Sequence, residues 1–575
     1  MLKQPNARAF CVGVILAGLC AALAGCRPAA TSVAAPANAA WFADVTPQAG
    51  VSFVQDPGAS NRYFMPESMG TGAALLDYDN DGRLDLYLLQ GAGPKSLSVN
   101  RLYHQEADGH FTDVTVGSGL GVAGFGIGVA IGDINNDGLP DVLVTGYGGV
   151  RLFLNLGGGK FQDVTREAGL NDPCWATSAS FFDYDRDGRL DLVIVNYVKY
   201  LDQPCPDPSG LPDYCAPSNF VGAASRLFHN LGPIPGHAGK SVHFADVTDA
   251  SGLGHTPGPG LGVTPLDFSG DGWPDLLITQ DGKANHLWIN KKNGTFGGEA
   301  LVRGIAVNNS GIAQANMGIA VGDLTGTGLP SVYVTHLTEE GNTLWDQTSP
   351  GMFEDRTAAS GLAALRHGTG FGTVMADFDN SGALDIAVVN GRVRHSQNSL
   401  PGTSPGADLG PHWSPYVENN QIFANDGTGH FRDISAANPA LCGYPNVGRG
   451  LACGDIYNDG GMDLVVTSIA GPVRILRDVA PNRGHWLDVR AIDPRYGGRD
   501  AYGARVTVLS GGSRRTNWIN PSYSILCSND PRAHFGLGSQ AKVDSIAVLW
   551  PDGKSETFPA VAADQVVTLR RGAGK

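Results

Sequence analysis

The sequence is short of charged residues. Asp, Glu, Lys and Arg make up 17% of its 575 residues, against about 25% in an average globular protein. Little charge together with 80 glycines and 35 prolines disfavours helical bundles and coiled coils. A hydrophobic content of 42% is too high for a disordered chain, and the glycines follow no three-residue period, which excludes collagen. What remains is a large, turn-rich β protein.

Positive charge is also scarce. The formal net charge is -15, which opposes binding to phosphate backbones and argues against a nucleic-acid partner. The charge is uneven, because residues 484–575 carry a net +4 and residues 26–483 a net -21. We expect something cationic to neutralise the larger part.

The chain has no apolar run long enough to span a membrane. Near the N-terminus, two basic residues precede a short apolar run over 10–19, which is typical of a secretory signal. The ending Leu-Ala-Gly-Cys26 resembles a bacterial lipobox. It predicts a lipoprotein signal peptide over 1–25, lipidation of Cys26 and a flexible tether over 26–40. The alternative is an ordinary cleaved signal followed by a chance cysteine. We expect secretion across the inner membrane and a periplasmic or cell-surface protein that meets the membrane only through its lipid.

The nine cysteines form no CxxC pair. Zinc ribbons, thioredoxin-type redox sites and c-type haem attachment therefore have no support. Six cysteines remain beyond the signal and Cys26, and they allow fifteen pairings. In an oxidising compartment, short spacings favour disulfides between Cys205 and Cys215 and between Cys442 and Cys453.

Motifs of common enzyme classes are sparse. Neither HExxH nor a P-loop is present. The GxSxG match at 402–406 contains Pro405, which cannot supply the N–H that an oxyanion hole needs. The sequence leans towards a protein that is not an enzyme. A calcium-dependent carbohydrate-active enzyme of the polysaccharide lyase or dehydratase type stays open, since scattered His, Arg and Tyr residues can build such chemistry.

What the chain does have is an internal repeat. An acidic phrase, DYDNDGRLD from Asp77, occurs seven times in related forms at an average spacing of about 63 residues. Two further phrases, Leu-Tyr-x-Asn and Phe-x-Asp-Val-Thr, keep the same order around it. Each unit is predicted to contain four short antiparallel strands, so the sequence predicts an all-β, seven-bladed β-propeller over 41–480. The phrase FADVT at 42 has no Leu-Tyr-x-Asn phrase before it, and RILRD at 474 has no Phe-x-Asp-Val-Thr phrase after it. We therefore expect the N-terminal strand to close the last blade, with a small β domain following over 484–575.

The acidic phrase offers carboxylates at positions 1, 3, 5 and 9, a turn glycine at position 6 and a backbone carbonyl at position 7. Such hard oxygen ligands suit Ca²⁺. An EF-hand is excluded because position 12 is Leu88, within a predicted strand. The alternative is a metal-free Asx-turn. The candidate metal ligands are Asp77, Asp79, Asp81, Arg83 and Asp85; Asp133, Asn135, Asp137, Leu139 and Asp141; Asp183, Asp185, Asp187, Arg189 and Asp191; Asp267, Ser269, Asp271, Trp273 and Asp275; Asp377, Asp379, Ser381, Ala383 and Asp385; and Asp455, Asp459 and Asp463.

The seven loops differ in quality. Serine at position 3 of the fourth loop and at position 5 of the sixth predicts weaker binding, and Tyr457 occupies position 3 of the seventh. The fifth loop keeps only Asp323 and is predicted to be empty. The sequence thus predicts five or six structural Ca²⁺ ions, enough to offset most of the negative charge.

The three phrases resemble integrin-α-like FG-GAP (VCBS) repeats over about 41–478. The tail resembles the ASPIC/UnbV domain of bacterial CRTAC-like lipoproteins, through the segments at 485–487, 503–506, 534–538 and 550–553. The resemblance implies calcium in the blade loops and an extracytoplasmic setting.

Two long insertions, 197–225 and 391–419, connect strands two and three of their units. Strand alternation places them on the face opposite the acidic loops. The candidate ligand-binding residues there are Tyr197, Tyr200, Tyr214, Arg392, Arg394, His395, His412, Trp413 and Tyr416. Aromatic and polar side chains on long loops suit a glycan or protein partner. Alternatively, the two insertions pack on each other as a lid, with Cys205 and Cys215 as a staple.

Together these features predict a calcium-binding extracytoplasmic lipoprotein that acts as a binding or adhesion module for a glycan or protein. The oligomeric state is not indicated. The positive tail carries Arg514, Arg515 and Arg532, which could dock on the acidic propeller, meet an anionic polymer, or simply form a solvated face.

Overall fold

The computed structural model describes residues 39–58, 62–170, 173–233, 242–395 and 409–575. The predicted signal peptide, Cys26 and most of the tether lie outside these residues. The described helices are short, and none of them is long and apolar enough to cross a membrane. They are α1 (Met65–Ser68), α2 (Thr248–Ser251), α3 (Gly410–Trp413) and α4 (Pro439–Cys442).

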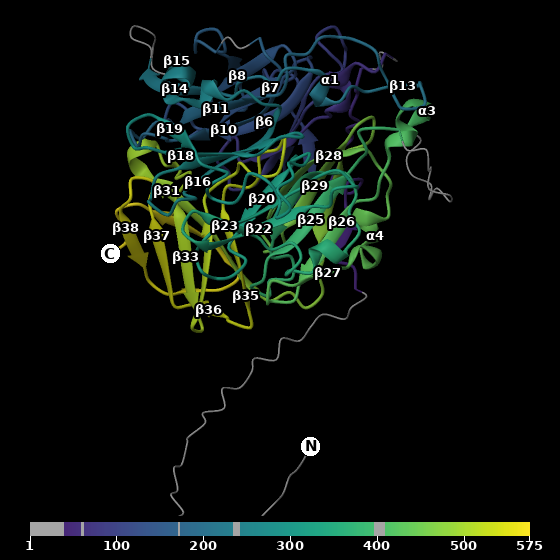
Figure 1. Cartoon of the computed structure of the whole chain (residues 1–575). Coiled ribbons are helices and arrows are strands. Elements are labelled where there is room, and N and C mark those ends of the chain that lie inside the picture. Colours follow the sequence, from purple (N-terminus) through teal and green to yellow (C-terminus); the bar gives the residue numbers. More distant parts are fainter. Residues whose placement is uncertain (1–38, 59–61, 171–172, 234–241, 396–408) are drawn as a thin grey trace, which may run out of the picture. The chain divides into compact units, whose positions relative to one another are not determined.

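Four-stranded antiparallel sheets make up most of the described chain (Figure 1), so the all-β prediction is confirmed. Seven of them have the strand order of the sequence repeat. They are β2 (Ala73–Leu76), β3 (Asp85–Leu88), β4 (Arg101–Gln105) and β5 (Phe111–Asp113); β6 (Gly126–Gly132), β7 (Asp141–Gly146), β8 (Gly149–Asn155) and β9 (Phe161–Asp163); β10 (Ala176–Phe182), β11 (Asp191–Asn196), β14 (Arg226–Pro233) and β15 (Val242–Asp246); β16 (Gly260–Leu266), β17 (Asp275–Gln280), β18 (His286–Asn290) and β19 (Phe296–Gly298); β20 (Ile319–Gly322), β21 (Ser331–Val334), β22 (Thr343–Ser349) and β23 (Met352–Asp355); β24 (Gly370–Ala376), β25 (Asp385–Asn390), β26 (Gln421–Asn425) and β27 (Phe431–Asp433); and β28 (Gly448–Gly454), β29 (Asp463–Ser468), β30 (Arg474–Asp478) and β1 (Phe42–Asp44).

The first strands of the seven sheets form a closed ring. Strand β2 contacts β6, and the contacts continue through β10, β16, β20, β24 and β28, which returns to β2. Strand β1 pairs antiparallel with β30, with Phe42 opposite Asp478. The N-terminal strand thus completes the last sheet, as predicted, and hides two sheet edges at once.

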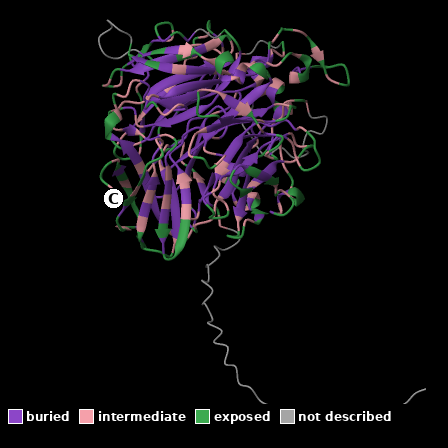
Figure 2. Cartoon of the chain, turned by 60° about the vertical axis from the view of Figure 1, so that its left-hand side comes forward, coloured by how far each residue is buried: buried purple, intermediate pink, exposed green. Residues whose placement is uncertain are grey.

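The hydrophobic core lies between neighbouring sheets. Inner strands such as β6 are buried throughout, and buried residues follow the strands while exposed ones gather in the loops (Figure 2). Glycine is needed where the inner strands crowd together, because a Cβ on Gly128 would lie 2.3 Å from the carbonyl oxygen of Thr177. The glycine-rich composition therefore has a steric cause at the ring centre.

The tail forms two small sheets and a strand pair around its own core, which includes Val506, Phe535 and Trp550. The first sheet contains β31 (His485–Asp493), β32 (Arg499–Asp500), β35 (Ala533–Gly538) and β40 (Gln565–Arg570). The second contains β33 (Arg505–Ser510), β34 (Ser513–Trp518), β37 (Ser545–Leu549) and β38 (Ser555–Phe558), and the pair is β36 (Lys542–Val543) with β39 (Val561–Ala562).

One connection of the tail, residues 520–530 between β34 and β35, enters the centre of the propeller. We call it the channel segment. Leu526 is 1% exposed, and a Cβ on Gly72 would lie only 1.8 Å from its carbonyl oxygen. Hydrogen bonds of the channel segment reach an inner strand of every sheet, at Ala73, Val129, Ser180, Thr264, Ile319, Thr373 and Cys453. The tail is thus inserted into the ring rather than placed beside it, which no sequence repeat indicated.

Candidate functional site

The seven acidic loops, residues 77–85, 133–141, 183–191, 267–275, 323–331, 377–385 and 455–463, connect the first two strands of each sheet. In the first loop, Asp77 accepts hydrogen bonds from the backbone N–H groups of Asp81 at 2.9 Å and Gly82 at 3.0 Å. The bond from the glycine at position 6 recurs in every loop, including the fifth at Asp323. Gly82 has a φ of +88°, which explains the glycine. The turn-forming role of position 1 therefore does not depend on a metal.

In every loop but the fifth, a carboxylate at position 9 ties the loop to the third strand. Asp85 accepts from the N–H of Tyr78 at 3.2 Å and from that of Gln105 at 2.9 Å. Asp141, Asp191, Asp275, Asp385 and Asp463 make the equivalent pair of bonds, and all are buried. Position 9 is thus structural whether or not it also binds a cation.

Three loops gather carboxylates closely enough to share an ion. In the first, third and sixth loops, ligand oxygens of Asp77, Asp79 and Asp81, of Asp183, Asp185 and Asp187, and of Asp377, Asp379 and Asp385 lie within 4.8 Å of one another. Asp183 Oδ1 is buried and has no hydrogen-bond partner within the described ranges. Such an orphaned oxygen beside other carboxylates fits a ligand for Ca²⁺, which takes six to eight oxygens.

Burial and mutual repulsion make the ionised form of these carboxylates unfavourable. Burial and the charges of nearby Asp79 and Asp77 raise the pKa of Asp85 to about 8, against the hydrogen bonds that it accepts from Gln105 and Tyr78. Burial and the charges of Asp191 and Asp187 raise the pKa of Asp183 to about 7. Without a cation, these groups hold protons near neutral pH, so a bound metal ion would replace a proton.

Two histidines join these clusters and were not predicted. His104 Nδ1 lies 3.0 Å from Asp85 Oδ1 in the first loop, and His229 Nδ1 lies 2.9 Å from Asp191 Oδ1 in the third. Both occupy the fourth position of the third-strand phrase, in RLYHQ and RLFHN. The signal was available, because histidine stands there only in the two repeats that keep all four aspartates.

The fifth and seventh loops neutralise charge differently. In the seventh, Arg477 pairs with Asp459 at 2.7 Å and Arg483 approaches the same carboxylate at 3.6 Å. In the fifth, Ser331 replaces the position-9 aspartate and donates its hydroxyl to Asp346. Guanidinium groups thus take up negative charge in the seventh loop, where Tyr457 already weakened the metal prediction.

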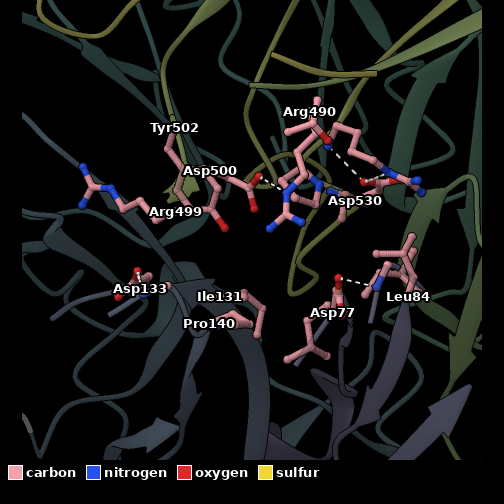
Figure 3. Close-up of a pocket in the computed structure, with 18 of the residues that line it drawn as sticks. Asp77, Leu84, Ile131, Asp133, Pro140, Arg490, Arg499, Asp500, Tyr502 and Asp530 are labelled. Atoms are coloured by element: carbon pink, nitrogen blue, oxygen red, sulfur yellow. Dashed lines mark hydrogen bonds and ion pairs between the residues drawn. The ribbon is translucent and has the colours of Figure 1, made fainter. Parts of the chain in front are cut away.

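The tail covers this acidic-loop face. A cavity of about 150 Å³ lies between the first two loops and the tail, lined by Asp77 and Asp133 on one side and by Arg490 and Arg499 on the other (Figure 3). Arg490 donates to Asp500 at 2.8 Å. Arg499 donates to Asn136 of the second loop at 2.8 Å, and Arg532 to the carbonyl of Asp455 in the seventh at 2.7 Å. Of the three arginines singled out in the sequence, Arg532 therefore donates to the propeller. Arg514 and Arg515 also lie beside its acidic loops, where their charges lower the pKa values of Asp323 and Asp377 against the effect of burial.

The two long insertions pack on each other. The Tyr214 hydroxyl oxygen lies 3.0 Å from His412 Nε2, and the Tyr416 hydroxyl donates a hydrogen bond to Asp213 Oδ1 at 2.7 Å. Tyr214, Trp413 and Tyr416 are each at most 6% exposed. The alternative of a closed lid thus describes these aromatic residues better than an open binding surface. His395 contacts Asp213 through its N–H, Arg392 pairs with Glu418 at 3.3 Å, and Tyr200 packs on Trp175.

Of the two predicted disulfides, the structure contains one. Cys205 and Cys215 form a disulfide that staples the hairpin of β12 (Cys205–Pro206) and β13 (Pro212–Asp213). The expected bond between Cys442 and Cys453 is wrong, since both are free and buried. Cys442 ends α4, which packs on the outermost strand β1, whereas Cys453 lies in the innermost strand β28. Three strand spacings, about 14 Å, separate the two strands.

A second cavity, of about 310 Å³, opens beside this lid at the centre of the ring. We call it the lid cavity. Tyr197, Tyr214 and Arg394 of the predicted ligand face line it. Its walls also include Asp281 and Met317, which the sequence reasoning missed because they lie in short connections without a recurring phrase.

Residues 77–144, 133–194 and 267–334 match the FG-GAP-like repeat family, and residues 495–575 match the ASPIC and UnbV family. The chain carries FG-GAP-like repeats and an ASPIC/UnbV domain. This confirms the resemblance seen in the sequence.

Cartilage acidic protein 1 is a relative by sequence. The mouse protein is 28% identical over 330 residues, covering 50% of this chain and 48% of the relative. The human protein is 27% identical, covering 49% and 46%. The chain thus spans about half the length of the curated relatives it matches. Among solved structures, an Agrocybe aegerita lectin that recognises terminal N-acetylglucosamine superposes with a TM-score of 0.39 at 14% identity, covering 71% of this chain and 94% of the lectin.

Proposed function

We propose that this protein is a calcium-stabilised, extracytoplasmic binding or adhesion module whose partner, a glycan or a protein, binds at the lid face. The FG-GAP-like repeats and the sequence relation to cartilage acidic protein 1 support a role as a binding module. The calcium part of the proposal rests on three loops in which carboxylate oxygens lie within 4.8 Å of one another.

Calcium would act here as a structural ion. The acidic loops lie between strands and beneath the tail, and their position-1 and position-9 carboxylates already hold the backbone. Bound Ca²⁺ would remove the repulsion among the remaining carboxylates and stabilise the ring and its contact with the tail. Five or six ions, as the sequence predicts, would offset most of the negative charge.

The lid face is the surface left for a partner. The tail occupies much of the acidic-loop face, and Phe42 begins β1 opposite Asp478, whose N–H binds Asp463 of the seventh acidic loop. The described chain therefore starts on the acidic-loop side.

A calcium titration and a partner screen test this proposal together. Purified protein is mixed with Ca²⁺ or chelator, its thermal unfolding is followed, and its retention on cell-surface polysaccharides and proteins is recorded with newly formed sugar ends. The proposal predicts stabilisation by Ca²⁺ and retention without new sugar ends. Absence of stabilisation, or new sugar ends that are lost in lid-face variants, would contradict it.

A further inference from the structure

The lid cavity is the mouth of the central channel. Its wall residues Leu261 and Phe371 belong to the first strands of the fourth and sixth sheets, at the ends remote from the acidic loops. They share one buried apolar cluster with Ile525 and Leu526 at the tip of the channel segment. The channel segment thus closes the channel from within, and the lid cavity is the space at the end of the channel remote from the acidic loops. Its volume is at the lower end of the range for small-ligand sites.

The floor of the lid cavity suits an unbranched aliphatic chain. Met65 of α1, Met69 directly after this helix and Met317 line it, and each is at most 5% exposed. Methionine side chains are flexible and polarisable, so they adapt to a narrow alkyl group better than branched side chains do.

One wall carries a carboxylate without a charged partner. Asp281 Oδ2 accepts a hydrogen bond from the buried Tyr197 hydroxyl at 2.6 Å. Among the described residues, no ion pair within 4.0 Å involves Asp281. Burial and the nearby charge of Glu340 raise the pKa of Asp281 to about 7, against the opposing effects of Tyr197 and Arg394. A ligand cation that enters the cavity would stabilise its ionised form.

The rim of the cavity is positive. Lys283 and Arg394 line it and are both exposed. A second cation near the opening would be repelled, whereas a carboxylate there would be attracted. Glu340, the other acidic residue of the lining, is occupied by the N–H of Ala315 at 2.8 Å. Glu340 is itself exposed, so the outer lining carries two cations and one carboxylate, a net charge of +1, around the inner carboxylate of Asp281.

We propose that the lid cavity binds an ω-amino acid group, with its ammonium on Asp281, its methylene chain on the three methionines and its carboxylate at Arg394 and Lys283. In a macromolecular partner, a lysine at the C-terminus of a protein presents this arrangement. This inference rests on the proposed function and names the partner chemistry of its lid face.

Isothermal titration calorimetry with 6-aminohexanoate tests this inference on the purified protein in Ca²⁺. We expect binding of 6-aminohexanoate, weaker binding of hexylamine and no binding of hexanoate. Asp281→Asn keeps an acceptor for Tyr197 and should lower the affinity for 6-aminohexanoate at least tenfold. The matched control Glu339→Gln changes an exposed carboxylate outside the cavity and should have no effect.

A second variant keeps the test valid if Asp281→Asn does not fold. Arg394 is exposed, so Arg394→Ala should fold, weaken 6-aminohexanoate severalfold and leave hexylamine unchanged. No binding of 6-aminohexanoate, equal binding by Asp281→Asn, or equal binding of hexanoate would overturn the inference. Binding of glucosamine oligomers but not of 6-aminohexanoate would overturn it in favour of an amino-sugar ligand. If Ca²⁺ stabilises the protein and the lid face retains a partner, such results refute this inference alone.

Discussion

The two faces of the propeller are built by different means. On the acidic-loop face, one nine-residue phrase recurs in every sheet. Its position-1 carboxylate accepts the same backbone hydrogen bond in every copy, and its position-9 carboxylate accepts the same kind of bond in every copy but the fifth. On the lid face, two unrelated insertions pack on each other through Tyr214, His412 and Tyr416. The comparison teaches that repeated sequence supplies the charge and geometry of the scaffold, whereas single-copy segments form the cavity at which specificity can arise.

The largest expected effect comes from the channel segment, which lies between the two faces. Gly72→Ala should destabilise the protein by about 3 kcal/mol or more, because its Cβ would lie 1.8 Å from the backbone oxygen of Leu526. Gly124→Ala is the matched control, since its Cβ would meet nothing closer than 4.0 Å. Denaturant unfolding of both variants measures the difference. Equal stability would show that the channel segment is not seated as described.

The next prediction concerns pH in the calcium-free protein. Burial and neighbouring carboxylates raise the pKa of Asp183 and of Asp377 to about 7, above the ordinary value of about 3.9. The folded state therefore binds protons more tightly than the unfolded state, and stability falls as the pH rises from about 4 to about 7. We expect a loss of about 2 to 3 kcal/mol for each such carboxylate between pH 5 and 7.5.

Calcium should reverse this slope, because protons compete with the ion for the same oxygens. Chemical unfolding at several pH values, with Ca²⁺ and with chelator, measures both slopes. A calcium-free protein that becomes more stable as the pH rises from 5 to 7.5 would refute the electrostatic description of the acidic loops.

The smallest effect is expected on the lid face. Tyr416→Phe removes the hydrogen bond to Asp213 and should cost about 1 kcal/mol. Ca²⁺ should stabilise Tyr416→Phe as much as the unmodified protein, because the lid insertions contain none of the acidic loops. Thermal unfolding with and without Ca²⁺ tests this independence, and an altered calcium response in Tyr416→Phe would break the separation of the two faces.

The repeated parts of the molecule could be predicted from the sequence, and the single-copy contacts could not. Seven acidic phrases in register sufficed for the sheets and for closure by Phe42–Asp44. The channel segment was missed because its partners, such as Ala73 and Ile319, lie hundreds of residues away and no phrase marks the contact. The predicted disulfide between Cys442 and Cys453 was wrong because the two residues, though close in sequence, lie at opposite edges of one four-stranded sheet.

The same distinction explains the ligand face. Aromatic residues in long insertions were expected to be exposed, but Trp413 and Tyr416 bury themselves against the other insertion. Asp281 could not be singled out, since a lone aspartate in a short connection is usually solvated. Its role depends on the cavity that distant segments build around it.

The central claim, that the acidic loops hold stabilising Ca²⁺, is tested most directly by a calcium titration of thermal unfolding in Asp183→Asn and Asp323→Asn. Both residues occupy position 1 and accept the same backbone bond from a glycine, but only the third loop keeps the other carboxylates. With dissociation constants of about 10⁻⁴ to 10⁻³ M, 10 mM Ca²⁺ should contribute roughly 1.4 to 2.7 kcal/mol per site. Asp183→Asn should lose one such increment and Asp323→Asn none; equal calcium responses in the two variants would contradict the account.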